Sequence, residues 1–138
     1  MTSQTPQQFL TQRFAALALG DYAAVYASYH AEAPFLQSFP DCAGYVDYAG
    51  QSLGAVQVRD WQSLRQRTLA ADRQEHLLLM ELVVDGVSQY FFELALLIET
   101  AEGWRYHSAQ KLGRDDYSGT PEQIDFCHFD QAAQKIVY

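Results

Sequence analysis

The chain has few basic residues and no long apolar run, and both absences restrict its partners. Nine Lys and Arg stand against 17 Asp and Glu among the 138 residues, for a formal net charge of −8. Because phosphate groups and anionic membrane surfaces are bound by clusters of Lys and Arg, we expect no nucleic acid and no membrane as a partner. No stretch approaches the roughly 18 apolar residues that cross a bilayer. The polar start MTSQTPQQ lacks the pattern of a signal peptide, which predicts a cytoplasmic protein.

The chain also has few cysteines. Cys42 and Cys127 are the only two cysteines. Without an export signal, two free buried thiols are expected in preference to a disulfide, because intracellular thiols stay reduced. A metal site built from these cysteines and His128 would have adjacent ligands in poor geometry and no evident fourth ligand. We therefore expect no metal and no cofactor.

Two segments carry the same signal for the start of a helix. Thr5–Gln8 and Thr120–Gln123 each place Thr at the N-cap, Pro at the first helical position and Gln three residues after the cap. The first predicts a helix that ends at Gly20, and Asp21 then caps a second, tyrosine-rich helix that stops before Pro34. The second predicts a C-terminal helix with apolar residues at helical spacing, namely Phe126, Phe129, Ala133 and Ile136.

The segment between these helices and the last half of the chain is less regular. Residues 35–39 are compatible with a short strand. Residues 41–56 contain three glycines and a weak helical period, which predicts a loop or a broken helix. Asp60 could cap a helix through Trp61, and a strand over the same residues fits almost as well.

The last half predicts three antiparallel strands at roughly 75–84, 87–100 and 104–112. If Gly103 is the left-handed residue of a three-residue loop, Thr100 pairs with Trp104. The same register places two pairs of opposite charge across the strands, Glu93 with Lys111 and Glu99 with Arg105.

The turn at Asp85 and Gly86 allows two registers. A two-residue loop would place Glu81 on the apolar face with Tyr90, whereas a longer loop aligns Met80 with Tyr90. Burying an unpaired carboxylate costs several kcal/mol, so we expect the longer loop.

These registers predict a sheet with two unlike faces. We expect the helices to cover the apolar and aromatic face, which carries Leu78, Met80, Leu82, Tyr90, Phe92, Leu94, Leu96, Ile98, Trp104 and Tyr106. The other face mixes apolar side chains with paired charges and suits a two-fold homodimer. The residues expected at this contact are Leu79, Phe91, Glu93, Leu97 and Lys111. The alternative is that the C-terminal helix from Pro121 covers this face in a monomer.

Three stretches resemble a known superfamily: RFAALALGDYAAVYASYH at 13–30, WQSL at 61–64 and YFFELALLIETAEGWRYH at 90–107. Their order is similar to that of the nuclear transport factor 2-like (cystatin-like) superfamily, and most similar to the middle domain of YchJ-type proteins, which accompany SEC-C motifs. The resemblance implies one α+β domain over residues 1–138, with N-terminal helices packed on a curved antiparallel sheet in the shape of a cone. The resemblance implies a fold but no particular reaction, because no established catalytic residues come with it.

Two features depart from that family. The SEC-C zinc motif needs a cluster of cysteines that this chain lacks. The family's usual proline after the motif histidine, His30 here, is replaced by Ala31.

The function is expected to reside inside the cone. The residues expected to line a pocket there are Tyr26, Tyr29, His30, Trp61, Tyr90, Trp104 and Tyr106. One hypothesis is a non-catalytic domain that holds a small apolar ligand or serves a partner protein. The other is a small-molecule lyase or isomerase, because enzymes of the superfamily use an acidic base with a Tyr or His partner. Its candidate residues are His30, Tyr26, Tyr106 and Asp47.

Two candidate residues also have plain structural interpretations. His30 could interact with the last carbonyls of the helix that it closes, rather than act as a base. Glu93 is expected in an ion pair with Lys111 on the mixed face, so the predicted register sends no strand carboxylate into the cone. A carboxylate near the tyrosines in an open pocket would favour the enzyme, and a filled cone would exclude it.

Overall fold

The helices and the strands segregate along the chain. The structure, a computed structural model, describes residues 4–54, 56–113, 117 and 119–130. In chain order the elements are α1 (Pro6–Leu19), α2 (Tyr22–Ala27), η1 (Pro34–Ser38), α3 (Cys42–Ser52), β1 (Val56–Ala70), β2 (Arg73–Val84), β3 (Val87–Thr100), β4 (Gly103–Gly113), η3 (Pro121–Gln123) and α4 (Phe126–Asp130). The strands form one antiparallel sheet in the order β1-β2-β3-β4.

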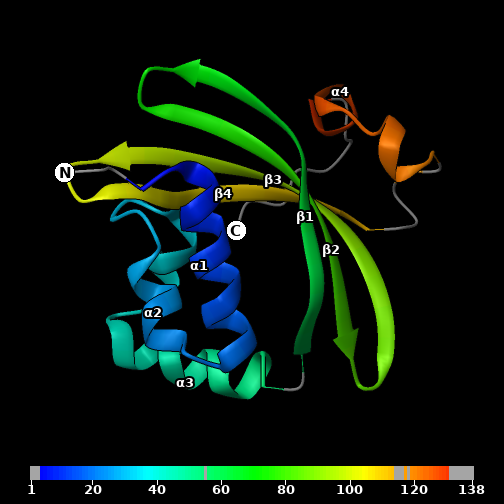
Figure 1. Cartoon of the computed structure of the whole chain (residues 1–138). Helices are drawn as coiled ribbons and strands as arrows, with labels where there is room; N and C mark the ends of the chain where they lie inside the picture. Colours follow the sequence, from blue (N-terminus) through cyan, green and yellow to red (C-terminus); the bar gives the residue numbers. More distant parts are fainter. Residues whose placement is uncertain (1–3, 55, 114–116, 118, 131–138) are drawn as a thin grey trace.

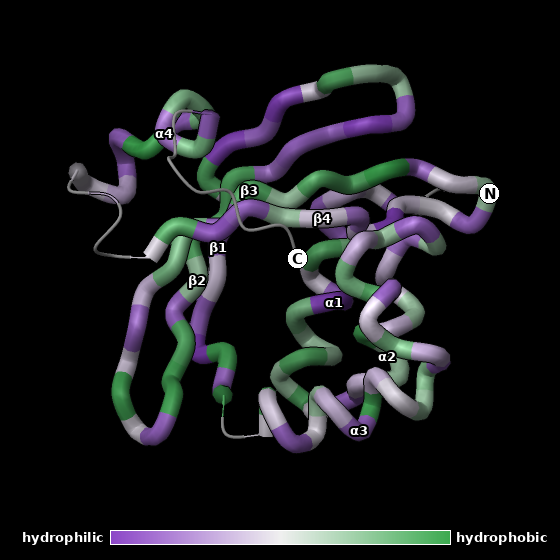
Figure 2. Tube along the Cα trace, turned by 180° about the vertical axis from the view of Figure 1, so that it is seen from behind, coloured by the Kyte–Doolittle hydropathy of each residue, from purple (hydrophilic) through white to green (hydrophobic). Residues whose placement is uncertain are grey.

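The sheet is curved and has helices on both sides. Helices α1, α2 and α3 lie within its curve, and α4 lies on the opposite side (Figure 1). The view from behind shows the same separation (Figure 2). The predicted α+β class, with N-terminal helices packed on a curved antiparallel sheet, is confirmed. Among the described residues no helix is both long and apolar enough to cross a membrane.

The N-terminal caps form as predicted. The Thr5 hydroxyl accepts a hydrogen bond from the Gln8 backbone at 3.1 Å, and the Gln8 side chain accepts one from the Thr5 backbone at 3.0 Å. Gly20 ends α1 at φ 72°, a conformation that glycine adopts without strain. Asp21 caps α2 through the backbone N–H of Ala24.

Helix α2 ends earlier than predicted because the following residues join the sheet. The His30 backbone N–H donates to the Tyr106 carbonyl, and the Tyr106 N–H donates to the Ser28 carbonyl, both at 2.8 Å. This pairing fixes Tyr29 against β4.

The middle of the chain differs from the prediction in two places. The expected strand at 35–39 is a 3₁₀ helix, η1. The expected loop or broken helix at 41–56 is the continuous helix α3, capped by Asp41, which accepts from the Gly44 N–H at 2.9 Å. Burial of Tyr45 and Ala49 stabilises this helix despite its glycines, because packing outweighs intrinsic propensity. The open alternative at Trp61 is resolved as a strand, β1.

The turn between β2 and β3 has two residues, so the predicted longer loop is wrong. Asp85 and Gly86 both have positive φ, at 52° and 79°, which is the turn geometry that matches the twist of the flanking strands. Glu81 therefore pairs with Tyr90. Its carboxylate is not orphaned, because it accepts from the Ser88 hydroxyl at 3.0 Å and lies 3.4 Å from Arg59 Nε.

The hairpin between β3 and β4 also begins in a different register. Thr100 pairs with Gly103 instead of Trp104, and Glu99 lies opposite Trp104 instead of Arg105. The Thr100 hydroxyl closes the loop by donating to the Gly103 carbonyl at 2.8 Å. The predicted pairing of Glu99 with Arg105 is therefore wrong.

Farther along the same pair of strands the predicted register is correct. Glu93 pairs with Lys111. The shift occurs where β4 contains one extra residue, His107, between the partners of Leu97 and Leu96. This bulge brings Trp104 and Tyr106 onto the same face as Lys111.

As a result, the two faces differ from the prediction. The inner face, which the helices cover, carries Val58, Trp61, Leu78, Met80, Leu82, Phe91, Glu93, Ala95, Leu97, Trp104, Tyr106, Ala109 and Lys111. The outer face carries Leu64, Leu77, Leu79, Phe92, Leu94 and Leu112. The residues of β3 thus lie on the faces opposite to those predicted. Of the residues expected at a dimer contact, Leu79 alone lies on the outer face, because the two-residue turn places Phe91, Glu93 and Leu97, and with Glu93 its partner Lys111, on the inner face.

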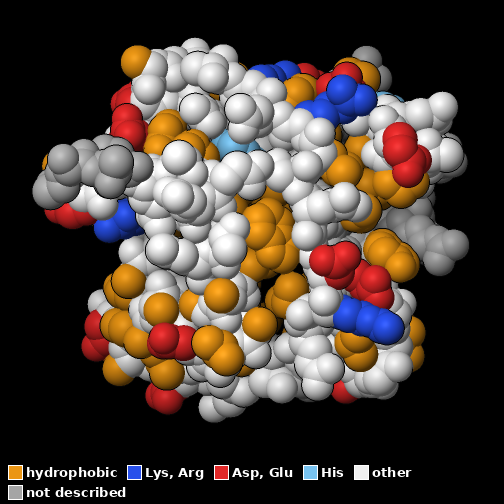
Figure 3. Space-filling model, viewed as in Figure 1, with side chains coloured by type: hydrophobic (Ala, Val, Ile, Leu, Met, Phe, Trp, Pro, Cys, Tyr) orange, Lys and Arg blue, Asp and Glu red, His pale blue; other side chains and the backbone are white. Residues whose placement is uncertain are grey.

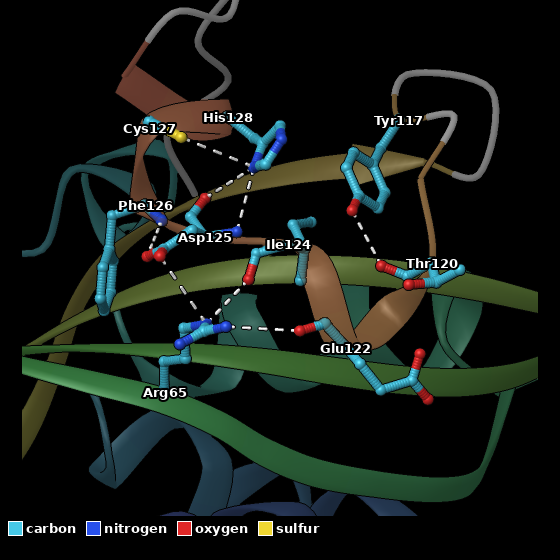
Figure 4. A network of polar contacts seen from close by, with 9 residues as sticks. All are labelled: Arg65, Tyr117, Thr120, Glu122, Ile124, Asp125, Phe126, Cys127 and His128. Atoms are coloured by element: carbon cyan, nitrogen blue, oxygen red, sulfur yellow. Dashed lines mark hydrogen bonds and ion pairs between the residues drawn. The ribbon is translucent and has the colours of Figure 1, made fainter.

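The C-terminal segment, of which residues 117 and 119–130 are described, covers part of the outer face. Ile124 and Phe129 are fully buried against this face. Arg65 on β1 holds the segment, because its Nε donates to the Ile124 carbonyl at 2.9 Å and its Nη2 to the Glu122 carbonyl at 3.3 Å (Figure 4). Part of the apolar area expected at a dimer contact is therefore covered within the chain.

The C-terminal helix begins later than predicted, at Phe126 instead of Pro121. Thr120 makes no side-chain cap, and the segment divides into η3 and α4. Asp125 accepts from the Phe126 N–H at 2.7 Å at the start of α4. Ala133 and Ile136 lie outside the described residues. Both cysteines are free, Cys42 half-buried and Cys127 exposed, so the expectation of a buried thiol at Cys127 is wrong.

Candidate functional site

A cavity of about 210 Å³ lies between the N-terminal helices and the inner face. The front of the molecule is hollowed between the helices and the ends of β1 and β2, with hydrophobic side chains at the bottom of the hollow (Figure 3). The apolar part of the wall consists of Phe14, Leu17, Phe35, Leu53, Val56, Val58, Met80 and Leu82. The polar part consists of Arg13, Tyr29, Tyr45, Tyr48, Glu93, Tyr106 and Lys111. We refer to this space as the central cavity.

Arg13 lines the cavity from α1 and is only 8% exposed. Its Nε donates to the Ser28 hydroxyl at 3.1 Å. Its Cζ atom lies 3.9 Å from the ring centroid of Tyr106 and 5.1 Å from that of Tyr29. Within the part of the chain that the structure describes, no carboxylate forms an ion pair with it. The buried guanidinium therefore rests on aromatic faces, each of which contributes about 0.5–2 kcal/mol.

Glu93 lines the cavity from β3 and is 3% exposed. Its Oε1 lies 3.7 Å from Lys111 Nζ, so the predicted ion pair is confirmed. Its Oε2 is buried and has no hydrogen-bond partner among the described residues. The prediction that no strand carboxylate reaches the cone is wrong, because the two-residue turn places Glu93 on the inner face.

Three tyrosines surround these charges. Tyr29 packs edge-on against Tyr106, with centroids 5.5 Å apart, and against Tyr45, at 5.9 Å. Burial raises the pKa of all three hydroxyls, and the negative charge of Glu93 adds to this effect for the pKa of Tyr106. All three hydroxyls are therefore protonated at neutral pH, and two of them have partners within the site, Tyr45 with Tyr29 and Tyr106 with Glu93.

Of the residues expected in the pocket, two line the central cavity and the others lie elsewhere. Tyr29 and Tyr106 line the central cavity. Tyr26 and His30 line a separate open groove of about 510 Å³. Trp61 and Trp104 pack in the core of the inner face, and Tyr90 is 43% exposed.

The candidate catalytic residues His30, Tyr26, Tyr106 and Asp47 do not meet. Asp47 is exposed on α3, and His30 faces His107 with ring centroids 5.6 Å apart. His30 Nδ1 accepts from the backbone N–H of Glu32 at 3.0 Å, which is a local structural contact.

Sequence reasoning missed Arg13 and Tyr45 as residues of the cavity, and placed Glu93 and Lys111 on the wrong face. A signal was present for Arg13, which continues the buried stripe of Phe9, Leu10 and Phe14 on α1. A charged residue on the apolar face of an amphipathic helix indicates a buried polar contact. Tyr45 carried no such signal, because α3 was not expected.

Comparisons with known proteins identify the fold. No family model and no curated protein matches the sequence. A domain of unknown function with a cystatin-like fold from Nostoc punctiforme PCC 73102 is similar in structure, with a TM-score of 0.59 and 12% identity over 88% of this chain and 81% of the other. A putative Ca/calmodulin-dependent kinase II association domain from Exiguobacterium sibiricum 255-15 has a TM-score of 0.57 and 15% identity, over 83% of this chain and 92% of the other. The chain therefore has a cystatin-like α+β fold.

Proposed function

We propose that the chain is a non-catalytic binding domain of the nuclear transport factor 2-like superfamily, related to YchJ-type middle domains, whose central cavity holds one small molecule. The observation that carries the proposal is the buried Oε2 of Glu93, which lines the cavity and makes no hydrogen bond of standard geometry with the described residues, although the Tyr106 hydroxyl interacts with the carboxylate. A buried acceptor without a partner costs about 1–3 kcal/mol, and more when it is charged. A bound molecule with a hydroxyl or an N–H group would remove this cost.

The size of the cavity limits the ligand to about one ring. An apolar protein cavity of about 150 Å³ accepts benzene. The central cavity, at about 210 Å³, therefore has room for one ring with a small substituent. Its apolar wall on β1 and β2 favours a hydrocarbon body, and Glu93 favours a single donor group on that body.

Phenol is a suitable probe, with toluene as its counterpart without a donor. We expect phenol to shift the amide signals of cavity residues in a two-dimensional NMR titration, with tighter binding than toluene. Leu82→Trp should fill the cavity and abolish binding. Val87→Trp, at an exposed position on β3, is the matched control and should bind phenol like the wild type. Binding that survives Leu82→Trp, or no binding to the wild type, would contradict the proposal.

The alternative function is a lyase or isomerase. It is favoured by one observation, the presence of a carboxylate, Glu93, and a protonated hydroxyl, Tyr106, in the wall of one cavity. These are the groups that general acid–base catalysis requires. If Glu93 acts as a base, the wild type should accelerate exchange of the α-hydrogens of cyclohexanone in D₂O, and Glu93→Gln should not. The binding proposal expects the buffer rate for both proteins.

A further inference from the structure

The charges in the wall of the central cavity do not cancel. Glu93 and Lys111 form an ion pair across β3 and β4. Arg13 adds a positive charge that no ion pair among the described residues neutralises. The described residues of the wall therefore carry one excess positive charge, although the whole chain has a formal net charge of −8.

The remaining polar groups of the wall are mainly donors. The N–H groups of the Arg13 guanidinium point outward in the plane of the group. The Tyr106 ring covers one flat side of the guanidinium, so N–H groups at its edge can still donate to a ligand. The hydroxyls of Tyr29, Tyr45 and Tyr106 are protonated; that of Tyr45 interacts with Tyr29 and that of Tyr106 with Glu93, so the Tyr29 hydroxyl and the Arg13 edge are the donors most open to a ligand. A cavity with these groups is complementary to an anion whose oxygen atoms accept several hydrogen bonds.

A buried cation needs a partner to be held at low cost. Transfer of an ion from water to a protein interior costs several kcal/mol unless its charge is compensated. The ring faces of Tyr29 and Tyr106 compensate part of this cost. An anion in the cavity would supply the rest, and a carboxylate fits the planar fork of an arginine in a bidentate contact.

We propose that Arg13 is the anion-binding residue of the central cavity and that the ligand is a monocarboxylate of about one ring, with its apolar body against Val58, Met80 and Leu82. A carboxylate fits the excess of one positive charge, whereas a doubly charged phosphate would leave a buried negative charge. This inference rests on the proposed function and adds the charge of the ligand to it. A hydroxyl on the ring would serve Glu93, so the class is that of aromatic hydroxy acids.

Four probes of the same ring size separate charge from shape. Benzoate carries the carboxylate, benzamide is its neutral counterpart, benzylamine carries the opposite charge, and 4-hydroxybenzoate adds a donor for Glu93. We expect the wild-type chain to bind benzoate at least about tenfold more tightly than benzamide, a difference of about 1.4 kcal/mol. Benzylamine should bind most weakly and 4-hydroxybenzoate most tightly. The same NMR titration measures all four.

Variants then test the role of Arg13. Arg13→Met should make benzoate and benzamide bind equally, and Arg13→Lys should keep part of the preference because the charge remains. Arg59→Met, at an exposed arginine on β1 outside the cavity, is the control and should keep the full preference. If Arg13→Met does not fold, the four probes on the wild type and on Arg13→Lys still decide the question.

The outcomes distinguish this inference from the proposed function. If benzamide binds the wild type as tightly as benzoate, the ligand is not selected by charge and the inference is wrong, while binding of phenol would still support a ligand cavity. If benzoate is preferred equally by wild type and Arg13→Met, Arg13 is not the residue that selects it. If neither phenol nor any of the four probes binds, both proposals fail.

Discussion

The Cζ atom of Arg13 lies 3.9 Å from the centre of the Tyr106 ring, which joins the middle of α1 to β4 through a cation and an aromatic face. Both side chains are buried, and Tyr106 also pairs through its backbone with the segment that follows α2. The same contact therefore stabilises the fold and forms part of the wall of the central cavity.

The ring of Tyr106, and not its hydroxyl, should carry most of its contribution to stability. Tyr106→Ala should lower the free energy of unfolding by about 3–5 kcal/mol, because it removes a buried ring from beneath Arg13. Tyr106→Phe keeps the aromatic face and should cost about 1 kcal/mol or less. Urea denaturation measures both, with Leu69→Ala, at an exposed apolar residue of β1, as the control. Equal losses for Tyr106→Phe and Tyr106→Ala would contradict this assignment.

The ion pair inside the cavity should show strong coupling in stability. Lys111→Met leaves the buried carboxylate of Glu93 without its cation and should lower the free energy of unfolding by about 1–3 kcal/mol. The double variant Lys111→Met/Glu93→Leu should be more stable than Lys111→Met alone, because no charge remains buried. A double-mutant cycle by urea denaturation measures the coupling. Additive losses would show that the two residues do not interact.

Stability should fall in mild acid because of His76. This side chain is fully buried, and burial lowers its pKa below the ordinary value of about 6.5. Below about pH 6.5 His76 is protonated in the unfolded chain, whereas in the folded chain it stays neutral to lower pH. The free energy of unfolding therefore decreases as the pH falls. Burial and the nearby His30 also lower the pKa of His107, which acts in the same direction.

The test compares urea denaturation at about pH 7 and about pH 5, on either side of the ordinary histidine pKa. His76→Leu should lose less stability than the wild type between these conditions, and His76→Leu/His107→Gln should lose less again. An unchanged pH dependence in both variants would assign the acid sensitivity to other groups.

A homodimer through the outer face remains a prediction, with a smaller contact than first expected. The C-terminal segment covers part of this face, and Leu79 and the partly exposed Tyr90 lie beside it. Light scattering should give a dimer for the wild type and a monomer for Leu79→Glu and Tyr90→Glu. Phe91→Glu, on the inner face, should reduce stability instead, since the helices pack over that face. A monomeric wild type at micromolar concentration would contradict the dimer.

Local sequence signals determined the parts of the fold that depend on neighbouring residues. The capping box at Thr5, the left-handed Gly20 and the cap at Asp21 all form as predicted, because each depends on contacts within a few residues. The three strands of the last half are also correct, since their apolar alternation and turn residues are strong local patterns.

Tertiary structure decided the rest, namely α3 and the face of each strand. Helix α3 forms because Tyr45 and Ala49 are buried, which its weak period did not indicate. In a strand one residue of shift exchanges the two faces, so the choice of turn at Asp85 sent Glu93 inward. In that register Glu81 has polar partners from two other strands, the Ser88 hydroxyl on β3 and the exposed Arg59 on β1, so its position is tolerated. The sequence by itself determined the elements and their order, while the position of the charges, and with it the central cavity, depended on contacts between distant residues.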